Sequence, residues 1–217
     1  MRRLLAVGVL TIAALITIQP ATAQDQSVQK WDLYGGYSYL NTPTNSLGQQ
    51  GFNLSFGRNI NRWLALGLDF SHFAGSGTQA MPLPAPLTGS LNVPYDASTS
   101  TFAAGTQFQV RPNKWITPFF RPFLGAFHSS ADAKVNEIVL PPGVPPALLQ
   151  AIPASELKRS DTVLGYGAGG GFDFNISTPI GIRVATDYIR TGLFGEHQNN
   201  VRVAFGLIYR FGGAISK

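Results

Sequence analysis

The sequence predicts an all-β fold, namely an eight-stranded antiparallel up-and-down transmembrane β-barrel preceded by a cleaved signal peptide. Three observations lead to this fold class. Residues 200–211 alternate apolar with polar or small side chains, seven earlier segments share that pattern, and loop-like and tight connections alternate between the segments. Neighbours along a strand face opposite sides of the sheet, so such strands suit lipid on one face and a polar lumen on the other.

The first residues have the pattern of a secretory signal peptide. Arg2 and Arg3 precede an apolar stretch at residues 4–18, which a small-x-small sequence at 21–23 follows. We therefore predict cleavage after Ala23, with residues 1–23 as the signal peptide and residues 24–217 as the barrel domain. A membrane anchor helix is the alternative, but the apolar core is short and the cleavage motif is well formed.

The composition narrows the class of protein further. With 12% charged and 44% hydrophobic residues the chain is not of the disordered class, and no later segment has the ~18 apolar residues of a spanning helix. Loss of Arg2 and Arg3 leaves 14 of 16 basic residues against 11 acidic ones. That small excess gives no reason to expect nucleic acid as a partner. The chain has no cysteine, so disulfides and cysteine metal ligands are excluded, and we expect no cofactor.

The alternation places the strands and their connections in order. The expected strands are 31–40, 52–57, 64–71, 101–110, 116–128, 162–176, 182–188 and 200–211. Tight turns follow the second, fourth and sixth strands. Two long segments, 74–96 with many Gly, Ser and Pro residues and 131–160 with many Pro residues, are expected to be loops, because such residues do not hold a sheet ladder. An even number of strands lets the last pair with the first and leaves no edge facing lipid.

The fifth and sixth strands depart from simple alternation. Arg121 shares its face with three of the four phenylalanines of the fifth strand, so the sequence leaves open which face meets lipid. Pro118 and Pro122 remove ladder donors and predict a local irregularity. In the sixth strand, glycines at alternate positions from Gly165 to Gly171 are expected to make room for bulky or charged side chains of neighbouring strands. A phosphate-binding loop would need a Lys-Ser/Thr pair and a helix, which do not follow.

The polar faces of the strands predict a charged interior. Its expected polar network comprises Asp69, Asp173, Arg183, Asp187, Arg202 and Arg210, with Asp32, Gln107 and Gln109 on the same faces. Because buried charges are costly unless they are paired, the arginines should meet the aspartates across the lumen. An eight-stranded barrel is narrow enough for such side chains to fill. The sequence thus favours a closed interior, with a narrow gated pore as the alternative.

The three tryptophans support a membrane location. Trp31, Trp63 and Trp115 open the first, third and fifth strands, so all three are expected at one rim as a periplasmic aromatic girdle. A soluble lipocalin-like cup is the least favoured alternative, because its aromatic side would have to face inward. Alternation alone does not separate the two folds.

The signal peptide, the eight strands and the segments GYGAGGGFDF, IRVATDY and VRVAFGLIYRF resemble the OmpA/OmpX-type outer membrane β-barrel family over roughly residues 24–217. The resemblance implies a bacterial outer membrane location, contact with outer membrane lipid and lipopolysaccharide, and recognition of the last strand by the barrel assembly machinery. We expect a barrel alone, without a peptidoglycan-binding domain. The family's last strand usually ends the chain on an aromatic residue, whereas here residues 212–217 follow Phe211.

The expected role is structural or a surface interaction of the adhesion type, through extracellular loops 74–96 and 131–160 and with a ligand that the sequence does not identify. Apolar loop residues such as Leu83 and Leu148 suit an adhesive surface. The resemblance also covers lipid A acyltransferases and deacylases that use rim His and Ser residues. Ser71 and His72 are neighbours in a strand and face opposite sides, so they cannot form such a pair, and we do not expect an enzyme.

Overall fold

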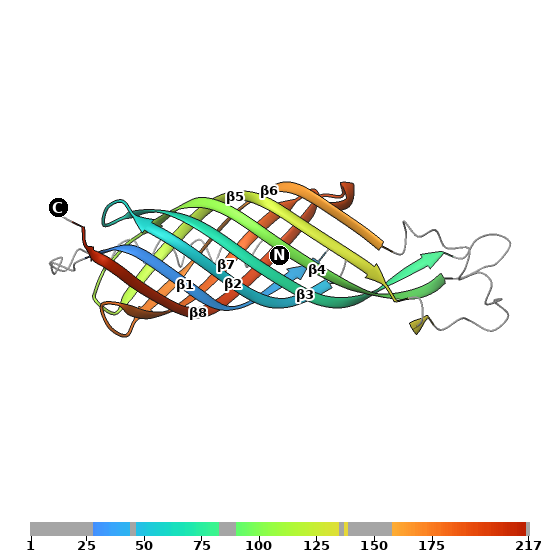
Figure 1. The fold of residues 1–217 in the computed structure, drawn as a ribbon, viewed down its shortest axis with the longest axis horizontal. Helices are drawn as coiled ribbons and strands as arrows, with labels where there is room; N and C mark the ends of the chain where they lie inside the picture. Colours follow the sequence, from blue (N-terminus) through green and yellow to red (C-terminus); the bar gives the residue numbers. More distant parts are fainter. Residues whose placement is uncertain (1–27, 44–46, 83–89, 135–136, 139–157, 216–217) are drawn as a thin grey trace, which may run out of the picture.

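Eight antiparallel strands form one closed barrel in the order β1 to β8 in the computed structural model, which describes residues 28–43, 47–82, 90–134, 137, 138 and 158–215 (Figure 1). The strands are β1 Gln29–Thr42, β2 Leu47–Asn59, β3 Leu64–Pro82, β4 Ser90–Gln109, β5 Ile116–Ala133, β6 Lys158–Asn175, β7 Ile180–Thr191 and β8 Gln198–Ala214. β1 pairs with β8 from Gln29 opposite Ala214 to Asn41 opposite Val201, with one register shift between Gln29 and Trp31. The predicted eight-stranded barrel is confirmed, while the expected signal peptide lies outside the described residues.

The described residues contain no helix that is long and apolar enough to cross a membrane.

The barrel has two unlike ends. The β2–β3, β4–β5 and β6–β7 connections are short and lie at the end where β8 finishes, which we name the turn end; the opposite end is the loop end (Figure 1). At the turn end, Asn61 Oδ1 accepts hydrogen bonds from the backbone N–H groups of Trp63 and Leu64, at 2.9 and 2.8 Å. Asn113 does the same for Trp115 and the residue after it, at 2.8 and 3.0 Å. Each asparagine closes its turn with its side chain and fixes a tryptophan at the start of a strand.

The segment 74–96 is not the loop that its composition predicts. β3 and β4 remain paired out to Pro82 opposite Ser90, and only residues 83–89 fall outside the description. Pro94 is tolerated because the ladder between β4 and β5 ends beside it, and its carbonyl accepts a hydrogen bond from the Lys134 N–H at 2.8 Å. We name residues 75–82 and 90–97 the β3–β4 ribbon. Its outer part, from Thr78 opposite Pro94 to Pro82 opposite Ser90, projects beyond the other strands (Figure 1).

The second predicted loop, 131–160, is also shorter than expected. β5 continues to Ala133 and β6 begins at Lys158, so strand pairing extends into both ends of this segment. Residues 145–152, whose sequence suits one helical turn, lie outside the described residues.

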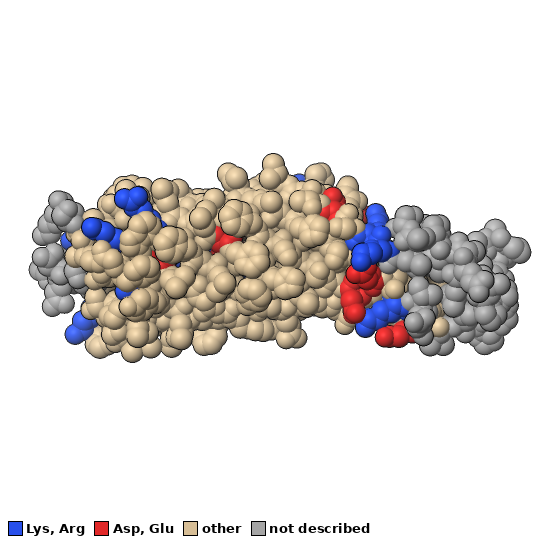
Figure 2. Space-filling view, in the orientation of Figure 1, with Lys and Arg blue, Asp and Glu red and all other residues tan. Residues whose placement is uncertain are grey.

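Outward side chains form an apolar band around the barrel. On β8, Phe205 and Leu207 are exposed whereas Arg202 and Arg210 are buried, and the same two-faced pattern occurs on the other strands. Charged side chains gather towards the two ends of the face shown in Figure 2, and the middle is almost entirely uncharged. An apolar, aromatic outer face is what lipid requires and is opposite to that of a soluble lipocalin-like cup.

The structure settles which face of β5 meets lipid. Phe120 and Leu124 point outward with exposed fractions of 53% and 67%, whereas Arg121 and Phe127 are buried in the lumen. The pairing between β4 and β5 is interrupted opposite Arg121 and Pro122, which is the irregularity that the prolines predict. The lumen therefore takes up aromatic side chains as well as charges.

The inward glycines of β6 face large side chains on the neighbouring strands. A β-carbon added to Gly165 or Gly167 would lie 2.8 or 2.5 Å from the ring of Phe127 or Phe123, respectively. These distances are too short for real contacts, so both positions need glycine. The prediction that the glycines make room for neighbouring side chains is confirmed.

Candidate functional site

The buried charged side chains of the described residues lie inside the lumen and form two groups of four. We name Asp69, Arg121, Asp187 and Arg202 the upper quartet. Arg202 contacts Asp69 Oδ1 through Nη1 at 2.7 Å and Asp187 Oδ2 through Nε at 2.8 Å. Arg121 contacts Asp187 at 2.8 and 2.9 Å and Asp69 at 3.4 Å. Two cations and two anions thus close a neutral ring across the barrel.

Uncharged neighbours complete the hydrogen bonding of the upper quartet. The Ser71 hydroxyl accepts a hydrogen bond from Arg202 Nη1 at 2.6 Å and donates one to Asp69 Oδ1 at 3.2 Å. Asn53 Nδ2 lies 3.0 Å from both Asp69 Oδ2 and the Ser71 hydroxyl. Because the charges are paired and their remaining lone pairs are occupied, the cost of burying them is largely offset.

The lower quartet consists of Asp32, Asp173, Arg183 and Arg210 and lies nearer the turn end. Arg183 forms a two-bond pair with Asp173 at 2.7 and 2.9 Å, and Arg210 Nη2 donates to Asp173 Oδ2 at 2.9 Å. Arg210 Nε is 4.0 Å from Asp32 Oδ1, so this corner is the loosest of the eight-residue system. This quartet also balances two cations against two anions.

Apolar side chains separate the charged layers and cover the upper one. Phe119 packs with Ala185 and Ala204, and the Arg183 guanidinium lies 4.4 Å from the centre of the Phe119 ring. A second cluster consists of Leu40, Phe73, Phe127 and Ile189. Two cavities of the described barrel, about 480 Å³ at the loop end and about 370 Å³ at the turn end, share no lining residue. Between them lies a cavity of only about 50 Å³, lined by residues of both quartets such as Asp69 and Arg183, and side chains occupy the rest of the lumen.

All six residues of the predicted polar network lie in the two quartets, but the prediction lacked two members. Arg121 was missed because the facing of its strand was open, and Asp32 was placed in the lumen but not in the network. The number of lumen charges in the sequence could have indicated the missing arginine. With Asp32 included, the predicted lumen held four aspartates for three arginines, which points to a fourth inward arginine.

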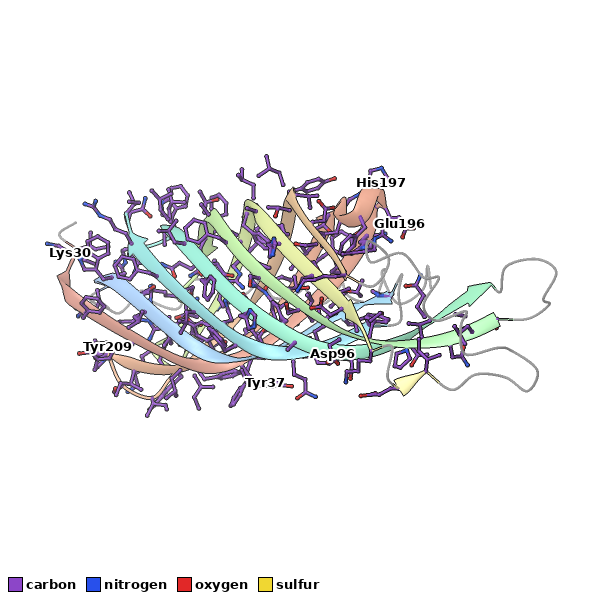
Figure 3. All side chains as sticks on the ribbon, turned by 45° about the vertical axis from the view of Figure 1, so that its right-hand side comes forward. Lys30, Tyr37, Asp96, Glu196, His197 and Tyr209 are labelled. Atoms are coloured by element: carbon purple, nitrogen blue, oxygen red, sulfur yellow. The ribbon has the colours of Figure 1, made fainter. Side chains whose placement is uncertain are left out.

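The three tryptophans lie at the turn end. Trp31 stacks on Phe56 with ring centres 5.2 Å apart, and Trp63 stacks on Phe108 at 6.1 Å. Trp115 is exposed on the outer face, with Lys114 Nζ 4.8 Å from its ring centre. Figure 3 shows Lys30 and Tyr209 at this end and Glu196 and His197 at the other.

The strand histidines pair with hydroxyl groups on the outer face. His72 Nδ1 lies 3.0 Å from the Ser100 hydroxyl, and His128 Nδ1 lies 2.7 Å from the Thr162 hydroxyl. Ser71 points inward to the upper quartet instead. Within the described part of the chain, neither histidine hydrogen-bonds to a carboxylate, and no group of three His, Asp or Glu side chains is placed to hold a metal ion. The third group that orients a catalytic base is therefore not provided by these contacts.

Comparisons with known proteins agree with this architecture. The family model described as outer membrane protein beta-barrel domain matches residues 10–211. Among solved structures, Ail, the attachment invasion locus protein of Yersinia pestis, is 18% identical with a TM-score of 0.52, covering 85% of this chain and 99% of its own. Neisserial surface protein A is 12% identical with a TM-score of 0.56, covering 83% and 96%.

OprG from Pseudomonas aeruginosa is also 12% identical, with a TM-score of 0.54, covering 86% of this chain and 97% of its own. No curated protein matches the sequence. At these identities the structural likenesses show the fold alone, whereas the family match spans nearly the whole chain. The protein belongs to the outer membrane protein beta-barrel domain family and is located in the bacterial outer membrane.

Proposed function

We propose that this protein is a closed structural barrel that presents the β3–β4 ribbon as an adhesion-like recognition surface outside the cell. The observation that carries the proposal is the ribbon itself. The ladder from β2 to β3 ends at Gln50 opposite Ala74, but β3 and β4 stay paired up to Pro82. At about 3.4 Å per residue, residues 75–82 add about 27 Å beyond that point. A paired ribbon holds its tip at a defined distance from the barrel, as an unstructured loop would not.

Ion pairs brace the base of the ribbon. Lys134 Nζ lies 3.1 Å from Asp96 Oδ1 and 3.7 Å from Glu137 Oε1. The hydrogen bond to Asp96 and the charges of both acids raise the pKa of Lys134, so it stays protonated across the physiological range. Asp132 and Lys158 form a further exposed pair at 3.4 Å. These charged residues at the loop end lie where the apolar outer band ends and the charged surface begins (Figure 2).

The two ends of the barrel suit opposite sides of the membrane. Short turns of outer membrane barrels are periplasmic and longer connections are extracellular, so the ribbon would face outward and the three tryptophans would form the periplasmic girdle. The apolar band would contact outer membrane lipid and lipopolysaccharide, and β8 would be the strand that the assembly machinery recognises. Leu83 and Leu148, expected to add adhesive surface, lie outside the described residues.

Other features support a binding role over conduction or catalysis. Ail, described as an attachment invasion locus protein, uses a barrel of the same fold. The side chains that fill the lumen disfavour a pore. The contacts of the histidines disfavour acyl chemistry. Mass spectrometry of lipid A from cells with and without the protein should give identical acylation, and a change in acyl chains would show instead that the protein is an enzyme.

Removal of the ribbon tests the proposed role. A variant that joins Ala74 to Ser98 through Asn-Gly keeps all eight strands up to the pair of Ala74 with Ser98 and lacks the ribbon. Cells that display it should adhere to host cells and extracellular matrix no better than cells without the protein, whereas wild-type cells should adhere above that level. Trp63→Phe, a change at the opposite end, is the control and should adhere like the wild type.

Surface amount and heat-modifiable migration on a gel must be equal for all three proteins. Wild-type adhesion by a folded variant without the ribbon would contradict the proposal.

A further inference from the structure

The cavity at the loop end, about 480 Å³ in volume, opens between the strand ends and is separate from the quartets. Its floor is apolar, because Leu40, Phe127 and Ile189 of the upper apolar cluster line it. Its walls combine apolar residues such as Leu47, Val93 and Leu193 with polar, mostly uncharged ones. The polar residues include Gln49, Thr99, Ser129, Thr191, Gln198 and Asn200. The volume falls within the ~300–1,000 Å³ that is typical of small-ligand pockets.

Two buried amide side chains in the walls each have one end free. The Thr99 hydroxyl donates a hydrogen bond to Gln49 Oε1 at 3.0 Å, which orients the amide and leaves Nε2 without a partner among the described residues. Asn200 Nδ2 donates to the Thr191 hydroxyl at 3.3 Å, and Asn200 Oδ1 is left without one in the same way. Gln49 is 1% exposed and Asn200 is 4% exposed. Both side chains line the cavity, and a small turn of either amide towards it would bring the free atom within reach of a guest. Buried polar atoms normally find partners, so this donor and this acceptor point to a guest in the cavity.

The chemistry of the lining defines the guest. Among the described residues, the formal charges that line the cavity are Arg159 and Glu196, which are of opposite sign, so a net charge on the guest gains nothing from them. A hydroxyl group both accepts and donates, and therefore satisfies Gln49 Nε2 and Asn200 Oδ1 alike. The apolar floor suits the C–H face of a sugar ring. We propose that the cavity binds a neutral saccharide of one or two rings.

An aromatic residue at the cavity mouth supports this assignment. Phe194 lines the cavity and has φ of 57°, in the left-handed region that aromatic residues rarely adopt. Its N–H donates to Asp161 Oδ2 at 2.5 Å, and the Arg159 guanidinium lies 5.3 Å from its ring centre. Strained backbone is kept where the surroundings impose it, and such positions cluster at ligand sites. Here it holds an aromatic ring at the entrance, where a second sugar ring can stack.

The β3–β4 ribbon contributes residues such as Thr78, Val93 and Tyr95 to the cavity lining. The inference still does not rest on the proposed adhesion role, because it concerns the inside of the barrel mouth and not contacts of the ribbon with a surface. The competing explanation is that ordered water alone fills the cavity and bonds to both amides. If the cavity is a sugar site, a neutral sugar displaces that water with saturable binding, and substitution of Gln49 or Asn200 weakens the binding more than substitution of an outward-facing neighbour on the same strand. If the cavity holds only water, neither result is expected.

Binding is measured by NMR on the mature protein in phospholipid nanodiscs, since alkyl glycoside detergents carry the chemical group under test. Glucose and maltose are titrated separately, with glucuronate as a charged comparison, and the side-chain amide signals of Gln49 and Asn200 are followed. We expect saturable shifts with a neutral sugar and weaker binding of glucuronate. Gln49→Leu and Asn200→Leu should each weaken binding about tenfold, the effect of one lost hydrogen bond.

Gln50→Leu is the matched control, because Gln50 adjoins Gln49 on the same strand and faces outward. It should leave the dissociation constant unchanged. Heat-modifiable migration establishes that each variant folds. If Gln49→Leu does not fold, Gln49→Glu replaces it, because glutamate keeps the side-chain shape and removes the hydrogen-bond donor. The proposal is overturned if neither neutral sugar gives a saturable shift, if glucuronate binds as tightly, or if Gln50→Leu weakens binding as much as Gln49→Leu.

Discussion

Arg121 on β5 and Asp187 on β7 form a two-bond ion pair across the intervening strand. The Nε–Oδ1 and Nη2–Oδ2 distances are 2.9 and 2.8 Å, and Gly169 of β6 lies opposite both residues. A β-carbon on Gly169 would stand 2.1 Å from Asp187 Oδ1. The contact that closes the upper quartet therefore depends on the absence of a side chain between its partners.

Gly169→Ala should destabilise the folded barrel. The added methyl group must push Asp187 away from Arg121, and overpacking of this kind costs about 1–3 kcal/mol. Equilibrium urea unfolding in lipid vesicles measures the change. Gly57→Ala is the matched control, since a β-carbon there meets its first neighbour at 3.6 Å, an ordinary contact distance. Equal unfolding free energies for the two alanine variants would show that Gly169 has no such role.

Arg202→Met should destabilise the barrel more than any single outward substitution. It removes the contacts to Asp69 and Asp187 and leaves two carboxylates facing one remaining arginine. Breaking a buried pair by removing one partner costs about 3–5 kcal/mol. Arg190→Met is the control, because Arg190 is exposed on β7 and forms no described salt bridge, and its cost should stay below about 1 kcal/mol. The same unfolding assay compares the variants, and a similar loss for both would disprove a role for the quartet in stability.

The tryptophan girdle can be located by depth-dependent quenching. In variants that keep one of Trp31, Trp63 and Trp115 and replace the other two by Phe, we expect lipids with a shallow quencher to reduce the fluorescence more than lipids with a quencher at the bilayer centre. The reason is that amphipathic indole rings settle at the membrane interface. Stronger quenching by the deep label at any of the three positions would remove that residue from the girdle.

Much of the fold follows from the alternation of apolar with polar or small residues. In a strand between lipid and lumen, every second residue faces lipid and is apolar, while the residues between face the lumen. β8 has the two faces that its sequence predicts. β5 was undecidable for a physical reason: the lumen contains apolar layers, so an inward face with Arg121 and three phenylalanines looks like neither a lipid face nor a polar one. Only the pairing of all eight strands brings Arg121 to its partner.

The connections were harder to predict than the strands. The β3–β4 ribbon is rich in Gly, Ser and Pro, and composition alone makes it a loop. Pairing continues there because β3 and β4 keep, beyond the barrel, the same register that they have inside it. Pro94 does not interrupt the sheet, because it lies where the ladder to β5 ends. The saccharide cavity has no sequence signature at all, since Gln49 and Asn200 come together from β2 and β8.

Conductance of the purified mature protein in planar bilayers tests the central claim, that two neutral quartets and the apolar layers close the lumen. We predict no discrete current steps for the wild type over a wide range of voltage. Serine substitution of Arg121, Arg183, Asp173 and Asp187 together is the positive control and should admit small currents. Discrete steps from the folded wild-type barrel would contradict the account and indicate a gated pore.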